Sequence, residues 1–251
     1  MELQNARILV VGSTGALGGG LASRLGVAGA RLALTGRRVD ALAEVAASTK
    51  AEHAFDLDLI DVDACATVVA EAANQLGGLD ALVVASGVAA FGPVRDEQDA
   101  VVEELFAVNT FAPMALVRAA VPLLGPGSSI AVITAVLADA PTAGMAAYSA
   151  SKAATSAYLT AIRRELRRDK ISVLDARPPH METGLADRAL VGVPPRMPPN
   201  PAPHIIARLI EIGLTESNGM GPSPLSWQAI GAWPQAALVA PACQWAFQIA
   251  Q

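Results

Sequence analysis

The sequence is poor in the residue types that build disulfide-rich, nucleic-acid-binding or aromatic-rich proteins. Aromatic side chains make up only 4% of its 251 residues, so the core has to be built from Ala, Val, Leu and Ile. Cys65 and Cys243 are too few for a disulfide framework, which favours a reducing cytoplasm. The densest basic run, residues 163–170, is interrupted by Glu165 and Asp169, and the net charge is −5. A nucleic-acid partner is therefore not expected.

Signals for secretion, membrane insertion and metal binding are also missing. The sequence shows no charged leader followed by an apolar signal segment, and no even apolar run of the roughly 18 residues that a membrane span needs. We therefore expect no membrane partner. No group of His, Cys and Asp residues has metal-ligand spacing, so we also expect no metal site. The 53% of hydrophobic residues are enough to fill a large core.

Short apolar runs alternate with helical patterns along most of the chain. The runs do not alternate apolar with polar residues, so both faces of each strand must be covered, which is typical of a parallel sheet. Strands are predicted at 7–12, 30–35, 51–55, 81–85, 129–134 and 171–176, and helices at 16–27, 39–47, 61–76, 97–124 (with a break) and 147–168. This order predicts an α/β fold with a Rossmann-type doubly wound sheet in three layers, as one domain over residues 1–251.

Two late segments depart from the alternation. Residues 178–203 hold eight prolines, which exclude a long helix or a central strand and favour a lid over a substrate. A helical pattern returns at 203–216, and the apolar tail 217–251 has no charged residue after Glu216. We expect this tail to form part of a substrate pocket or a subunit contact.

A glycine loop follows the first predicted strand. Gly12, Gly15 and Gly18 have the spacing G-x-x-G-x-x-G and open a helix, which is where a dinucleotide fold brings its backbone close to a pyrophosphate. A tight structural turn without a ligand is the alternative, but the strand-loop-helix context favours a bound dinucleotide. The predicted contacts of this loop are Gly12, Ser13, Thr14, Gly15, Leu17 and Gly18.

The end of the second predicted strand indicates which dinucleotide is bound. An acidic residue usually receives the ribose 2′-hydroxyl of NAD at this position, and none is present. Arg37 and Arg38 stand there instead, and a guanidinium suits a 2′-phosphate, which favours NADP(H) over NAD(H). A solvated pair of arginines is the alternative. Asp56 and Leu57, after the third strand, are expected either to flank the adenine or to cap a helix.

Tyr148 and Lys152 are the sharpest chemical feature. Residues four apart share one face of a helix, and a nearby ammonium is expected to lower the pKa of a phenol. Such a phenol can act as an acid or a base. The pair opens the predicted helix that follows the fifth strand, a position at which an isolated exposed pair is less expected.

Over residues 7–183 these motifs, in this order, resemble the short-chain dehydrogenase/reductase family. Beside the glycine loop and the run Tyr148–Lys152, the segment 80–87 is similar to the family's fourth strand and its turn. Asn109 matches the position of the family's helix asparagine, and residues 177–183 resemble the segment that touches the nicotinamide. The resemblance adds Ala85, Ser86, Gly87, Tyr148, Lys152, Pro178 and Thr183 to the predicted cofactor contacts.

The resemblance also implies roles for the reacting groups. Tyr148 would exchange a proton with the oxygen of a carbonyl or alcohol. Lys152 would hold the nicotinamide ribose and tune Tyr148, and Asn109 would support a water that links Lys152 to solvent. The cofactor would move the hydride.

Several positions depart from the family pattern. The catalytic serine usually lies thirteen residues before the tyrosine, and that position is Ala135, which cannot donate a hydrogen bond. Thr134 is a weak substitute, because neighbours on a strand point to opposite faces. Val84 replaces an asparagine of the turn, and Pro179 replaces a glycine. Losing one oxyanion donor costs on the order of 10²–10³ in rate.

Two functions therefore stay open at this point. The first is an NADP(H)-dependent oxidoreductase for an apolar carbonyl or secondary alcohol, and the second is a dinucleotide-binding sensor or interaction module with little catalysis. His180 is either a proton-transfer group or a loop residue bonded to backbone. An alanine stripe on the predicted helix 147–168 favours a homodimer or homotetramer, although it could instead pack on the sheet. The expected pocket wall comprises Val88, Phe91, Val136, Leu137, Met145, Met181, Leu185 and Trp227.

Overall fold

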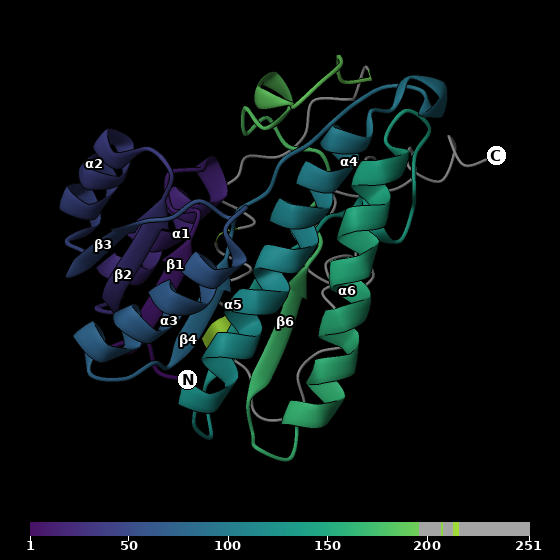
Figure 1. The fold of residues 1–251 in the computed structure, drawn as a ribbon. Helices are drawn as coiled ribbons and strands as arrows, with labels where there is room; N and C mark the ends of the chain where they lie inside the picture. Colours follow the sequence, from purple (N-terminus) through teal and green to yellow (C-terminus); the bar gives the residue numbers. More distant parts are fainter. Residues whose placement is uncertain (196–206, 208–212, 216–251) are drawn as a thin grey trace, which may run out of the picture.

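Six parallel strands form one sheet at the centre of the molecule (Figure 1). The structure is a computed structural model, and it describes residues 1–195, 207 and 213–215. The strand order is β3-β2-β1-β4-β5-β6, and the order reverses between β1 and β4. The strands are β1 (Arg7–Val11), β2 (Arg31–Gly36), β3 (His53–Asp56), β4 (Ala81–Val84), β5 (Ser129–Ile133) and β6 (Ser172–Ala176). The predicted parallel α/β sheet is confirmed.

The central strands are apolar throughout because both of their faces are buried. In the parallel register Val10 of β1 lies between Leu34 of β2 and Val83 of β4, and all three are fully buried. β3 differs, because it is an edge strand with exposed residues alternating along it. β6, at the other edge of the described sheet, is buried without alternation like the central strands, so the non-alternating pattern marks strands that are covered on both faces.

Helices cover both faces of the sheet. The helices are α1 (Ala16–Val27), α2 (Val39–Thr49), α3 (Val62–Leu76), α4 (Asp99–Phe106), α5 (Ala112–Ala120) and α6 (Ala146–Leu166). Side chains of α3, α5 and α6 share one core with one face of the sheet, while α1, α2, Ala207 and Leu214 share the core on the other face. Figure 1 shows α5 and α6 running beside each other along the first of these faces.

The break predicted within residues 97–124 is a π-helical turn, η2 (Ala107–Phe111), between α4 and α5. Pro113 in the first turn of α5 has no N–H to donate to the carbonyl of Asn109, four residues earlier. The hydroxyl of Thr155 on α6 donates to this carbonyl instead, with an oxygen–oxygen distance of 2.6 Å. The irregular turn is therefore fixed against α6, and it carries Asn109.

One helical run departs from the sequence expectation about membranes. Residues Asp99–Leu123, through α4, η2, α5 and η3 (Val121–Leu123), are long and apolar enough to cross a membrane by length and composition. Half of the apolar window is buried inside the protein, where α5 packs on α3 with Ala115 and Leu116 fully covered. A single half-buried helix of this kind is weak evidence for a membrane span.

The other boundaries differ from the predicted ones by a few residues. Asp61 is the N-cap of α3 rather than its first residue, because its carboxylate accepts a hydrogen bond from the N–H of Ala64 at 2.9 Å. The predicted helix 203–216 and tail 217–251, with Trp227, and the part of the lid beyond 195 lie outside the described residues, apart from 207 and 213–215.

Candidate active site

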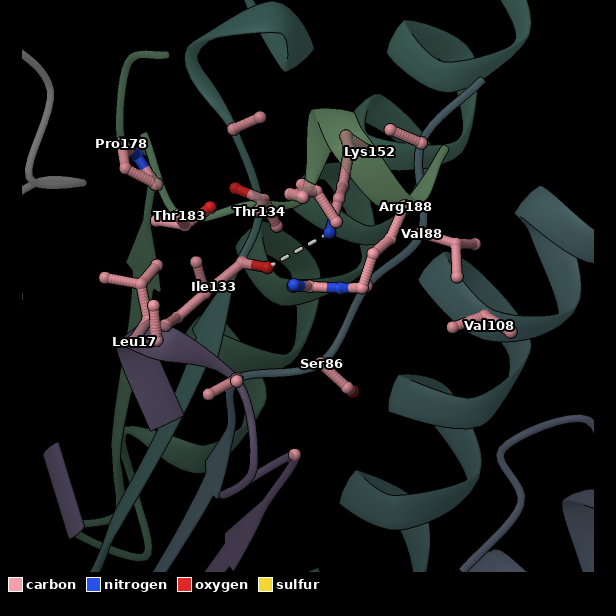
Figure 2. Close-up of a pocket in the computed structure, with 18 of the residues that line it drawn as sticks. Leu17, Ser86, Val88, Val108, Ile133, Thr134, Lys152, Pro178, Thr183 and Arg188 are labelled. Atoms are coloured by element: carbon pink, nitrogen blue, oxygen red, sulfur yellow. Dashed lines mark hydrogen bonds between the residues drawn. The ribbon is translucent and has the colours of Figure 1, made fainter. Parts of the chain in front are cut away.

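A cleft of about 380 Å³ opens at the carboxyl ends of β1, β4 and β5. This is where the strand order reverses, the position at which open parallel sheets bind ligands. The wall is formed by the glycine loop, the ends of β2 and β3, the turn after β4, the start of α6 and the segment 178–188 (Figure 2). All seven described residues of the predicted pocket wall line it, from Val88 to Leu185.

The glycine loop is shaped by two close backbone approaches. Gly12 has a φ of +82°, and a Cβ there would lie 2.9 Å from the backbone of Ser86. A Cβ on Gly18 would lie 2.2 Å from the carbonyl oxygen of Gly12, so no larger residue fits between loop and helix. α1 begins after Gly15 without a side-chain cap, which leaves its first N–H groups available to an anion at the cleft.

Not every predicted loop residue faces the cleft. Gly12, Thr14, Gly15 and Leu17 line it. Ser13 does not, because its buried hydroxyl donates to the carbonyl of Thr35 at 3.0 Å. Gly18 also does not line the cleft and allows α1 to approach the loop closely.

The end of β2 brings two guanidinium groups to one end of the cleft. Arg37 and Arg38 both line it and are exposed, and neither makes an ion pair with any described residue. Leu57 lines the cleft with its neighbour Asp58, whereas Asp56 ends β3 and lies outside the lining. Asp56 is also not a helix cap, since Asp61 caps α3.

The turn after β4 lies against the buried side chains of Lys152 and Asn109. Ala85, Ser86 and Gly87 line the cleft, and the buried Ser86 hydroxyl has no hydrogen-bond partner among the described residues. A Cβ on Gly87 would lie 3.0 Å from the Lys152 Nζ and 3.2 Å from the Asn109 Oδ1. The absence of a side chain at 87 therefore lets the turn rest on both groups.

Asn109 fixes the backbone of the turn rather than lining the cleft. Its Oδ1 accepts a hydrogen bond from the N–H of Val88 at 3.0 Å, and its Nδ2 donates to the Val88 carbonyl at 2.9 Å. The same Nδ2 donates to the hydroxyl of Ser151 on α6 at 3.1 Å. Asn109 thus joins η2, the β4 turn and the helix that carries Tyr148 and Lys152.

Tyr148 and Lys152 lie on the face of α6 that is turned toward the cleft, and both are buried. The Lys152 ammonium is 6.0 Å from the centre of the Tyr148 ring and donates to the carbonyl of Ile133 at 3.3 Å (Figure 2). Burial lowers the pKa of Lys152 to about 8, although the charge of Asp175 opposes the shift. The pair is thus placed for proton transfer to a ligand in the cleft.

The expected effect on the phenol is wrong in direction for this structure. We predicted that the ammonium would lower the pKa of Tyr148, but burial raises that pKa to about 12. Removing the phenolate from water costs more than the ammonium supplies at this distance. Tyr148 therefore keeps its proton at neutral pH and is suited to donate it.

The end of β5 does not supply a hydroxyl to the cleft. Ala135 is buried in the wall at the predicted serine position. The Thr134 hydroxyl donates to the buried carboxylate of Asp175 and is therefore not available as the substitute donor that we considered. The hydroxyl of Thr142, on the loop after β5, contacts the carbonyl of Ala140 at 3.4 Å and does not line the cleft.

Asp175, which no motif in the sequence predicted, organises this half of the site. Its fully buried carboxylate accepts hydrogen bonds from Thr134 after β5, Ser156 on α6 at 2.7 Å, and the Arg177 Nε at 2.7 Å. Arg177 also contacts Asp139 on the loop after β5. An acidic residue inside an otherwise apolar strand, followed two positions later by an arginine, is the signal that was available.

The segment after β6 closes the cleft. The Pro178 carbonyl accepts a hydrogen bond from the N–H of Val136 at 3.0 Å, and both Pro178 and Thr183 line the cleft. Pro179 and His180 line it as well. Burial lowers the pKa of His180, and the charge of Glu182 opposes the shift.

The arrangement fits a nicotinamide dinucleotide. The loop leaves backbone N–H groups open, the Ser86 hydroxyl is unpartnered among the described residues, and two guanidinium groups stand at the end of β2. The other end of the cleft is apolar, where Phe91, Met145 and Ala135 pack around Tyr148. A phenol that holds its proton in an apolar pocket can protonate an oxygen on a ligand.

Comparison with known proteins decides the family. The sequence profile of short chain dehydrogenases matches residues 6–190. The chain belongs to the short-chain dehydrogenase family. Members are oxidoreductases with a Rossmann fold that binds a nicotinamide dinucleotide.

Solved structures and curated relatives agree with this membership. A short chain dehydrogenase from Burkholderia cenocepacia J2315, solved in complex with NADP, is 27% identical, with a TM-score of 0.79 over 88% of this chain and 94% of that one. A dehydrogenase/reductase from Sinorhizobium meliloti 1021 is 28% identical, with a TM-score of 0.73 over 83% and 88% of the two chains.

Among curated proteins, the dehydrogenase/reductase SDR family member 7B of Mus musculus is 30% identical over 75% of this short-chain dehydrogenase and 61% of the relative. The Xenopus tropicalis protein of the same name is 30% identical over 76% and 65%. This chain therefore spans less than two thirds of the length of these relatives.

Proposed function

We propose that this short-chain dehydrogenase transfers hydride between NADP(H) and a carbonyl or secondary alcohol. The observation that carries the proposal is the pair Tyr148 and Lys152, buried on one face of α6 and turned into the cleft. A buried lysine is costly to keep, since its charge is desolvated, and such groups cluster at functional sites.

Each reacting group has a defined part in the reduction of a carbonyl. The cofactor, held by the glycine loop and the residues at the end of β2, would supply hydride chemistry when bound. Tyr148 donates its phenolic proton to the carbonyl oxygen, and the ammonium of Lys152 favours the phenolate that forms. Asn109 holds the turn of Gly87 and Val88 against Lys152 and so keeps the ammonium in place.

The preference for NADP(H) is supported by Arg37 and Arg38. Both line the cleft beside the end of β2, carry no described ion-pair partner, and can each bind a 2′-phosphate. Titration with NADPH and NADH measures the preference, and we expect NADPH to bind at least tenfold more tightly. The variant Arg37→Gln should remove most of that difference, and equal affinities in the unmodified protein would defeat the proposal.

The activity is tested by following NADPH oxidation with a panel of ketones, aldehydes and diketones. We expect turnover with an apolar member of the panel, because the substrate end of the cleft is apolar. Tyr148→Phe removes only the phenolic hydroxyl, and we expect a loss of about 10²–10⁴ in rate with NADPH binding retained.

A second candidate is a dinucleotide-binding module with little catalysis. Ala135 favours it, because neither Ala135 nor the engaged hydroxyl of Thr134 can hold a substrate oxygen. Tight NADPH binding without turnover on the whole panel would support the module and reject the enzyme.

We also propose that the protein forms a homodimer or homotetramer through α6. Most of the alanine stripe faces away from the sheet, whose side of α6 is formed by residues such as Ser156 and Leu159. The stripe comprises Ala150, Ala157 and Ala161, which are exposed, and Ala147 and Ala154, which are half-buried. Small residues allow two helices to pack closely. Light scattering coupled to size exclusion measures the mass, and a monomer at micromolar concentration would reject this proposal.

A further inference from the structure

Arg188 is held at the substrate end of the cleft by a well-anchored segment. It ends the short helical turn η5 (Ala186–Arg188), and the residues that follow η5 are hydrogen-bonded to the segment after β4. The N–H of Leu190 donates to the carbonyl of Ala89 at 2.8 Å, and the N–H of Phe91 donates to the carbonyl of Val191 at 3.0 Å. The backbone that carries Arg188 is thus fixed relative to the cleft.

The side chain of Arg188 points into the cleft. Figure 2 shows it among the residues that line the cleft, and a Cβ on Gly184 would lie 2.9 Å from the Arg188 Nη1, so the guanidinium lies beside that glycine. Its guanidinium makes no hydrogen bond or ion pair with any described residue, and the neighbouring carboxylates Asp187 and Glu182 do not pair with it. Arg188 is exposed, and the five N–H donors of this permanent cation at the cleft have no partner among the described residues.

The surroundings of η5 belong to the substrate end rather than to the cofactor end. Leu185 and Ala186 pack against the apolar cluster that contains Phe91, Met145 and Tyr148. The opposite end of the cleft has its own cations, Arg37 and Arg38, at the end of β2. Among the described lining residues, Arg188 is thus the arginine that stands beside the apolar cluster.

We propose that Arg188 binds an anionic group of the substrate, and that the substrate class is an oxo acid: an apolar body that carries a carboxylate and a carbonyl. The carboxylate would pair with the guanidinium, and the apolar body would lie on the cluster around Tyr148. The assignment rests on the proposed reductase function for the reaction, but the binding of the acid does not depend on turnover.

A phosphate of the cofactor is the other possible source of the anion, and the experiment separates the two. The probes are acetylbenzoate and phenylglyoxylate, each compared with its methyl ester, which has the same shape without the charge. Their dissociation constants are measured on the NADP⁺-loaded protein, and NADPH affinity is measured separately. The variants are Arg188→Gln, Arg188→Lys and, as a matched control, Arg95→Gln, which removes an exposed arginine outside the cleft.

We expect the loaded protein to bind at least one acid more tightly than its ester. Arg188→Gln should weaken the binding of that acid by about tenfold to a hundredfold, since a charge-assisted bidentate pair is lost, and should change the affinity for the ester by less than about threefold. Arg188→Lys should restore part of the affinity, and Arg95→Gln should change neither ligand. NADPH affinity should be unchanged in all three variants.

Three results would overturn the proposal. The first is that no acid binds more tightly than its ester. The second is that Arg188→Gln weakens acid and ester equally. The third is that Arg188→Gln weakens NADPH while the acid keeps its advantage, which would assign the guanidinium to the cofactor. Each is distinct from failure of the proposed function, in which the protein binds NADPH and reduces no member of the carbonyl panel.

Discussion

The two ends of the cleft are built by different means. The cofactor end is formed by the backbone. Gly12 and Gly18 allow close backbone approaches that a Cβ would block, and the first N–H groups of α1 have no side-chain cap. The substrate end is made of side chains, with Asp175 joining three segments and Tyr148 and Lys152 buried on α6. The proposed binding of the dinucleotide therefore depends on the absence of side chains, whereas the proposed catalysis depends on particular side chains, and the serine hydroxyl expected among them is absent at Ala135.

The largest effect should come from the loop glycines. Gly18→Ala places a Cβ 2.2 Å from the Gly12 carbonyl oxygen and must displace the loop, so we expect NADPH affinity to fall about a hundredfold or more. Gly20→Ala is the matched control, because its Cβ would lie 3.9 Å from the Ala207 side chain, an ordinary contact. NADPH fluorescence measures binding, and circular dichroism checks folding. Equal NADPH affinities of the two variants would show that the close backbone approach at Gly18 is not needed for binding.

The buried carboxylate should dominate the stability of the substrate end. Asp175→Asn keeps the shape but leaves Arg177 and two hydroxyls poorly paired, so we expect a loss of about 3 kcal/mol in the free energy of unfolding. Asp139→Asn removes the other partner of the same arginine. Asp139 is 54% exposed, and we expect a loss below about 1 kcal/mol there. Urea denaturation compares the variants, and equal losses would show that Asp175 has no special role.

The pH dependence of reduction should follow Lys152. Its pKa is lowered to about 8, so the ammonium is present below pH 8 and is lost as the pH rises through that value. The pKa of Tyr148, raised to about 12, keeps the acid protonated over the same range. We expect kcat/KM for carbonyl reduction to be level below pH 8 and to fall about tenfold per pH unit above it. Residual activity in Lys152→Arg should lack this decline, and a wild-type profile that stays level would contradict the assignment.

The fold was predictable because its signals are local. Non-alternating apolar runs such as residues 8–11 predicted the central strands, and glycine spacing together with the pair Tyr148 and Lys152 predicted the two ends of the cleft. A break within the helix 97–124 was also predicted, but its place at Ala107–Phe111 and its π-helical form were not, and the turn is held by Thr155, far along the chain.

The missed features depend on contacts between distant residues. Thr134 lies 41 positions from Asp175, so its sequence context does not reveal that its hydroxyl is engaged. The raised pKa of Tyr148 depends on burial by several segments, which spacing alone does not report. The direction of the Arg188 side chain likewise depends on the contacts between η5 and the segment after β4.

The comparison between the two ends is tested most directly by placing a serine hydroxyl at position 135, where the chain has Ala135. The measurement is the single-turnover rate of NADPH oxidation, with a ketone that the wild type reduces, in wild type and in Ala135→Ser. Ala135 is extended and lines the cleft, so a hydroxyl there has access to a substrate oxygen. We predict a rate increase of about tenfold with unchanged NADPH affinity, a part of the 10²–10³ that one donor supplies. An unchanged or lower rate at equal affinity would contradict the account.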